Sequence, residues 1–162
     1  MLDDPFKYGL LAALAIALLV AAVTDMRRRT ISNWLCGAVA LAAPLFWWAS
    51  GLPLWPDIAW QLGLAAAAFA VLAGLFALGQ MGGGDVKLLT ALALWIAPLP
   101  FLRLLIVMAL VGGVLTLFIG AWKIARRRRN EISVPYGVAI ATAGLWVLGT
   151  SYLPASSAAG LG

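Results

Sequence analysis

The chain is a succession of long apolar runs separated by short polar segments. A helix that crosses the hydrocarbon core of a membrane needs roughly 20 mostly apolar residues. Six runs fit this pattern, and the fourth is short for a full span, which tilting or local thinning of the bilayer would accommodate. The alternative is five spans and one re-entrant helix. The six predicted spans cover residues 6–24, 34–52, 57–78, 86–98, 101–124 and 134–153.

Composition supports a membrane protein. The chain has 64% hydrophobic and 10% charged residues, whereas soluble domains have about 45–50% and about 25%. An apolar content this high, with a mean hydropathy of +1.02, cannot be buried in one aqueous core. We therefore expect an all-α polytopic membrane protein with a single transmembrane domain over residues 1–162. The chain has no histidine and one cysteine, Cys36, so we expect no metal site and no cofactor.

The distribution of charge predicts the orientation. With six spans, residues 24–33, 79–87 and 123–133 share one side of the membrane and carry nine of the eleven basic residues, while Lys7 and Arg103 lie on the other side. The positive-inside rule places the nine in the cytoplasm and both termini outside. The net charge of +5 is thus interpreted as a topology signal, and no nucleic-acid partner is expected.

Charge order also argues against a cleaved signal peptide. Asp3 and Asp4 precede the first apolar run and Arg27 to Arg29 follow it, which reverses the order typical of signal peptides. The first run is expected to be a permanent span. Tryptophan favours the membrane–water interface, and we expect four to mark the outer end of the second and third spans: Trp47, Trp48, Trp55 and Trp60.

Two of the six acidic residues, Asp25 and Asp85, border predicted spans, where a carboxylate is costly without partners or a function. Asp25 precedes Arg27 to Arg29, so one interpretation is a helix end whose carboxylate is held by arginines. Asp85 follows Gly82 to Gly84, so it could be the N-cap of the fourth span. A phosphate-binding loop is disfavoured because Asp85 adds negative charge and no Gly-Lys-Ser/Thr ending follows.

The two aspartates are more informative together. Two predicted spans separate them, so both return to the same membrane face. Two carboxylates that meet in a medium of low dielectric tend to share one proton. The ionised member can then activate water while the protonated member polarises a carbonyl group. This chemistry needs no metal, histidine, cysteine or cofactor, and it predicts Asp25 and Asp85 as a catalytic pair.

The residues around both aspartates resemble the type IV prepilin peptidases, which belong to the broader group of Gly-x-Gly-Asp aspartic membrane proteases. The resemblance covers nearly the whole chain, with three elements in the expected order. The three elements are Asp25 followed by basic residues and Ile31-Ser32-Asn33, then Gly82-Gly83-Gly84-Asp85 continued by Val86-Lys87-Leu88-Leu89, and lastly Pro135-Tyr136-Gly137 within residues 134–139.

This resemblance implies a membrane-embedded aspartic endopeptidase of the bacterial inner membrane, with its active site at the cytoplasmic face. The implied substrates are prepilins and pilin-like proteins, cleaved after a glycine that ends a short basic leader. Archaeal preflagellin peptidases are also similar. The resemblance implies catalytic roles for Asp25 and Asp85 and places seven further residues in the motifs or the substrate loop: Asn33, Gly82, Gly84, Lys87, Pro135, Tyr136 and Gly137.

Larger members of the family carry a cytoplasmic insertion with paired Cys-x-x-Cys motifs and methylate the new amino terminus. Here the first cytoplasmic loop is short and Cys36 is alone, which excludes such an insertion. The chain is similar to the compact peptidases of Tad-type (Flp) pilus systems, and this likeness implies cleavage without methylation.

Other functions stay open on the residues alone. Buried carboxylates in six spans would also suit a small proton- or cation-coupled transporter, although such sites lie near the bilayer midplane. A structural assembly protein is a third possibility. Arg27 to Arg29 and Arg126 to Arg129 are interpreted as topology determinants that attract anionic membrane lipids, since they would repel a basic leader. The oligomeric state is unknown.

Overall fold

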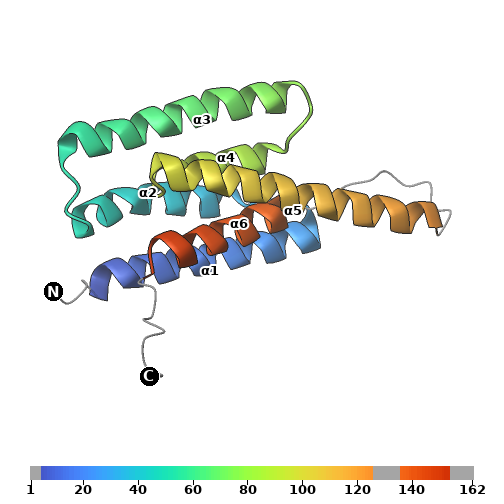
Figure 1. The fold of residues 1–162 in the computed structure, drawn as a ribbon, viewed down its shortest axis with the longest axis horizontal. Coiled ribbons are helices and arrows are strands. Elements are labelled where there is room, and N and C mark those ends of the chain that lie inside the picture. The colour runs from blue at the N-terminus through green and yellow to red at the C-terminus, as the bar shows by residue number, and fades with distance from the viewer. Residues whose placement is uncertain (1–4, 126–135, 154–162) are drawn as a thin grey trace, which may run out of the picture.

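The computed structural model describes residues 5–125 and 136–153, which form helices joined by short connections (Figure 1). The all-helical prediction is confirmed, because the described part of the chain contains six α-helices and each overlaps a predicted span. A short irregular turn, η1 (Leu54–Ile58), leads into the third helix. The helices are α1 (Pro5–Arg28), α2 (Asn33–Ala49), α3 (Ala59–Ala77), α4 (Gly83–Ala93), α5 (Pro98–Ala125) and α6 (Tyr136–Ser151).

Consecutive helices run in opposite directions, so that α1, α3 and α5 point one way and α2, α4 and α6 point back (Figure 1). The carboxyl ends of α1 and α3 therefore meet the amino ends of α2, α4 and α6 at one end of the bundle. We call this the aspartate end, because Asp25 and Asp85 lie there. The start of α1 and the end of α6 lie at the opposite end (Figure 1).

The interior is built around α4, which packs against α2, α3, α5 and α6. Its Leu88, Leu89 and Leu92 are fully buried. Helix α6 packs along α1, where Gly144 approaches Leu18 so closely that a Cβ at Gly144 would lie 2.8 Å from Leu18 Cδ1. Small residues of this kind let helices in membranes approach each other at van der Waals distance.

Three segments are long and apolar enough to cross a membrane: Pro5–Arg28, Leu54–Ala77 and Pro98–Trp122. Two shorter apolar helices, Asn33–Ala49 and Tyr136–Ser151, accompany them. Most side chains of the second and third long segments are exposed, as expected of surfaces that face lipid.

The fourth predicted span, 86–98, differs most from its helix. Helix α4 ends at Ala93, which gives it a length of about 16 Å, roughly half of the hydrocarbon core. A turn follows, and Pro98 then begins α5, in keeping with the preference of residues before proline for non-helical backbone. The sequence pattern could not separate this buried apolar turn from the helix, because both are equally hydrophobic.

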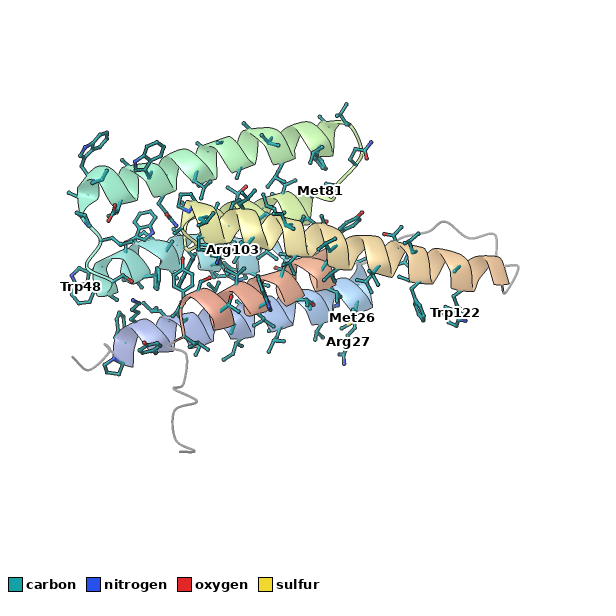
Figure 2. The ribbon with its side chains drawn as sticks, viewed as in Figure 1. Met26, Arg27, Trp48, Met81, Arg103 and Trp122 are labelled. Atoms are coloured by element: carbon teal, nitrogen blue, oxygen red, sulfur yellow. The ribbon has the colours of Figure 1, made fainter. Side chains whose placement is uncertain are left out.

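Trp47 differs from the other three tryptophans predicted to mark this end. It is buried, and its indole Nε1–H donates a hydrogen bond to the carbonyl oxygen of Leu94, 2.7 Å away. This bond gives the backbone carbonyl just past the end of α4 a hydrogen-bond partner within the protein, so that it does not depend on water for one. Trp48, Trp55 and Trp60 are exposed, as expected, and Figure 2 shows Trp48 at the end opposite the aspartates.

Candidate active site

Asp25 lies inside α1 and not after its end. The helix continues to Arg28, four residues past the predicted span, and Arg27 and Arg28 favour this extension because cations stabilise the carboxyl end of a helix dipole. Arg29 then ends the helix with φ of 54°, and its N–H donates to the carbonyl oxygen of Asp25 at 2.8 Å. A left-handed residue directly after a helix satisfies terminal carbonyls in this way.

The side chain of Asp25 is held by α6. It is 7% exposed, and its Oδ2 accepts a 2.7 Å hydrogen bond from the backbone N–H of Gly137. A Cβ at Gly137 would lie 2.8 Å from both Oδ2 and Cβ of Asp25, closer than side chains approach. Within the described residues no ion pair joins Asp25 to Arg27 or its neighbours, which are exposed, so the interpretation of an arginine-held carboxylate is not supported.

Asp85 is the third residue of α4, which begins at Gly83 with Gly82 as its N-cap. The interpretation of Asp85 as the N-cap is therefore wrong by three positions. Its carboxylate turns back to the backbone N–H of Gly82, as an acid at the third position of a helix does in a capping box. The side chain is 9% exposed. Capping explains the orientation of Asp85 but leaves the cost of burying its charge unexplained.

The glycines before Asp85 lie close to neighbouring atoms that leave little space for a side chain. None of Gly82, Gly83 and Gly84 has a positive φ, which in this loop occurs at Gly79. A Cβ at Gly84 would lie 3.0 Å from Cβ of Ile31, and one at Gly82 would lie 3.0 Å from Oδ2 of Asp85. Gly84 thus lets the buried Ile31 bring the α1–α2 connection onto this loop. The sequence places Ile31 in the first matched element, but its contact with Gly84 was not predicted, because that contact depends on how the two connections pack.

The fold brings the two aspartates together at the aspartate end. Their charges interact, and both side chains are almost fully buried. Figure 2 shows this end of the bundle, where Met26 and Arg27 of α1 lie at the same end as Met81 of the α3–α4 loop. Two buried carboxylates whose charges act on each other are hard to ionise at the same time. Such a pair can act as a base and an acid in the same reaction.

Two other candidate residues meet beside this pair. Nζ of Lys87 donates a 2.8 Å hydrogen bond to Oδ1 of Asn33, which joins the first turn of α4 to that of α2. Both border a groove of about 490 Å³ that continues along Cys36 and Thr90. Cys36 lies next to the site, with its Sγ 3.9 Å from the carbonyl oxygen of Gly84. Lys87 is thus engaged by an amide and not by the neighbouring carboxylate.

The third motif anchors the start of α6. The ring of Tyr136 packs on Gly112 of α5, where a Cβ would lie 3.2 Å from Cε1 of the ring. This contact holds the backbone N–H of Gly137 beside Asp25. Pro135 lies outside the described residues. Among residues 5–125 and 136–153, no group of three histidine, cysteine or acidic side chains could hold a metal ion.

A match to a protein-family model indicates the kind of activity that this chain has. The model of the type IV leader peptidase family matches residues 12–120, about two thirds of the 162 residues. The chain belongs to this family. Searches of the curated proteins and of the solved structures gave no match. The leader peptidase is a helical membrane protein whose family implies pilin-like substrates. Asp25 and Asp85 both lie within the matched residues.

Proposed function

We propose that this leader peptidase is an aspartic endopeptidase in which Asp25 and Asp85 form the catalytic dyad. The observation that carries this proposal is the meeting of two buried carboxylates, one from α1 and one from α4. Within the described residues these are the only buried acidic side chains. Burying a charged side chain lowers the stability of the fold, and both aspartates lie within the residues that match the family. A catalytic role best explains why such side chains are present.

The reaction is hydrolysis of one peptide bond. The ionised carboxylate of the dyad removes a proton from water, and the oxygen of that water attacks the carbonyl carbon of the scissile bond. The protonated carboxylate donates its proton to the carbonyl oxygen. Collapse of the tetrahedral intermediate breaks the C–N bond, and the proton first taken from water passes to the leaving nitrogen. One hydroxyl of the intermediate returns its proton to the second carboxylate as the C=O bond reforms, so the dyad ends as it began, with one carboxylate ionised and one protonated.

The substrate of this reaction is a prepilin or pilin-like protein of the Flp/Tad type. Its short basic leader would remain in the cytoplasm, and cleavage after the leader's final glycine would release the hydrophobic helix into the membrane. The resemblance in Gly82 to Asp85 and the absence of paired cysteines support a compact enzyme that does not methylate its product. We place it in the bacterial inner membrane with the dyad at the cytoplasmic face.

All six helices cross the membrane in this proposal, with both termini outside. The basic residues at the end of α1 and after α5 support this orientation. Helix α4 is too short to cross the bilayer by itself, and the apolar turn between Ala93 and Pro98 completes this span.

A cleavage assay tests the proposal. The purified protein in detergent is mixed with a synthetic Flp-type prepilin, and the products are identified by mass spectrometry. We expect the leader to be released after its final glycine without added metal, ATP or ion gradient. With S-adenosylmethionine present, the mature product should show no gain of about 14 Da, the mass of one added methyl group. An uncleaved prepilin would contradict the proposed substrate, and a methylated product would contradict the single activity.

A further inference from the structure

The end of the bundle opposite the aspartates contains a second candidate site. A cavity of about 600 Å³ lies there between the starts of α1 and α3, the end of α2, the α4–α5 connection and the end of α6. This volume is within the range of small-ligand sites. The residues relevant to its chemistry are Lys7, Ser50, Asp57, Trp60, Gln61 and Trp95.

One wall of the cavity is fixed by bonds within the protein. The indole Nε1–H of Trp95 donates to the carbonyl oxygen of Val39 at 2.8 Å, and the hydroxyl of Tyr152 accepts from the N–H of Ala97 at 2.9 Å. The ring of Trp95 also stacks on Phe46, with centroids 5.0 Å apart. The polar groups of Trp95 and Tyr152 are already hydrogen-bonded within the protein. Hydrogen bonds to a ligand would therefore come from other residues of the cavity.

Four polar side chains of the cavity have unused bonding capacity. Gln61 is 6% exposed, and the hydroxyl of Ser50 is buried with no hydrogen-bond partner. Among residues 5–125 and 136–153, no bond or ion pair engages the side chains of Gln61, Lys7 or Asp57. Gln61 and Ser50 are the ones withdrawn from solvent, whereas Lys7 is half-buried and Asp57 is exposed, so the free-energy cost of buried polar groups without partners falls on Gln61 and Ser50. A polar ligand that fills this cavity would remove that cost.

The arrangement of charge specifies the ligand. We propose that the cavity binds the headgroup of a phospholipid that carries both a phosphate and a primary ammonium group, as phosphatidylethanolamine does. Lys7 and Ser50 donate to the phosphate, and Asp57 accepts from the ammonium. The indole rings of Trp60 and Trp95 favour the same cation through their π faces. The amide of Gln61 can donate to one group and accept from the other.

The location of the cavity favours a lipid over a soluble phosphoamine. Trp48, Trp55 and Trp60 are exposed and lie at the end of α2, in η1 and at the start of α3, which is the arrangement of aromatic residues found at the level of lipid headgroups. The exposed apolar faces of α3 and α5 offer surfaces for the acyl chains. The proposal concerns binding and does not depend on the catalytic dyad.

Native mass spectrometry of the full-length protein in detergent tests the proposal. Phosphatidylethanolamine is compared with phosphatidylglycerol, which has the phosphate and no ammonium. We expect at least tenfold tighter binding of phosphatidylethanolamine, a loss of that preference in Asp57→Asn, and weaker binding of both lipids in Lys7→Gln. Arg103→Gln is the matched control, because it removes a positive charge expected on the same side of the membrane and does not line the cavity.

Two results would overturn this assignment. Equal binding of both lipids by the wild-type protein would show that the ammonium is not recognised, whatever the variants do. Unchanged preference in folded Asp57→Asn, or unchanged binding of both lipids by folded Lys7→Gln, would show that the lipid binds elsewhere. Soluble glycerophosphoethanolamine is the last arm, and its displacement of the lipid at equal concentration would show that a free phosphoamine is the ligand.

Discussion

At the scale of single residues, the orientation of Asp25 depends on one backbone N–H. Gly137 donates to Oδ2 of Asp25 from the first turn of α6, and the absence of a side chain at Gly137 is what permits this distance. The bond fixes one oxygen of the carboxylate and leaves the other for water or for Asp85. Gly137 is a positioning residue in this account, since it acts on the reaction through Asp25.

Gly137→Ala tests that role. The added Cβ would overlap Oδ2 of Asp25 and displace the carboxylate, and a displacement near 1 Å can cost about 100-fold in rate. We expect a loss of at least that size in initial cleavage rate. Gly149→Ala is the matched control on the same helix, because nothing lies within 4 Å of its added Cβ. Similar rates for the two variants would show that the bond to Gly137 does not position Asp25.

The backbone of Arg29 provides a second test at this scale. A non-glycine residue in the left-handed region costs about 1 kcal/mol, so Arg29→Gly should raise the stability of the protein by up to about that amount. Arg28→Gly removes the same charge from a helical position and should lower stability by about 1 kcal/mol. Thermal melting in detergent measures both variants. Shifts in the same direction would mean that charge, and not the backbone of Arg29, sets the effect.

At the scale of elements, the loop before α4 joins two parts of the site. Gly84 faces Ile31 of the α1–α2 connection, Gly82 faces the carboxylate of Asp85, and Gly83 faces the ring of Phe76 at 3.4 Å. The three positions therefore differ in what a Cβ would meet, although the sequence presents them as a uniform run. Only the contact of Gly83 is an ordinary van der Waals distance.

Alanine at each of these glycines should give different results. Gly84→Ala should lower both stability and cleavage rate, because the side chain and backbone of Ile31 leave no room for a Cβ. Gly82→Ala should lower the rate with less effect on stability, because it displaces the carboxylate of Asp85. Gly83→Ala should be the mildest. The measurements are initial rate and melting temperature, and equal small losses at all three positions would make the loop a simple connector.

The sequence predicted the helices better than their ends and contacts. Apolar runs located all six helices, because burial in lipid or protein requires long apolar segments. The carboxyl end of α1 was missed because Arg27 and Arg28 look like a loop but stabilise the last helical turn. The motifs predicted Asp25 and Asp85 as a pair, while Gly137 as the partner of Asp25 depends on how α6 packs on α1. Such packing is not encoded in local periodicity.

At the scale of the whole molecule, the two ends of the bundle have different chemistry. One end gathers the two aspartates, while the other contains the polar cavity and the exposed Trp48, Trp55 and Trp60. Apolar faces of α3 and α5 lie between them, as expected of a protein that spans a bilayer. The hydrolysis proposed at one end and the lipid binding proposed at the other should therefore respond independently to mutation.

Cysteine labelling tests the orientation of this molecule. Cys36 is the sole cysteine and is buried, so Cys36→Ala provides a background for single new cysteines. With six spans, an impermeant maleimide added to spheroplasts should label Ser156→Cys and leave Arg128→Cys unlabelled until the membrane is broken. If α4 were a re-entrant helix, five spans would remain and the two labelling results would be exchanged.

The central claim is that Asp25 and Asp85 together perform the hydrolysis, and the most direct test is cleavage of a prepilin by purified Asp25→Asn and Asp85→Asn proteins. The amide keeps the shape of the carboxylate but cannot exchange the shared proton, so each variant should lose at least about 1,000-fold in rate while melting like the wild type. Asp4→Asn, before α1, should keep the wild-type rate. Cleavage by either folded dyad variant at more than about a tenth of the wild-type rate would contradict the dyad, because loss of general acid–base catalysis costs at least about 100-fold.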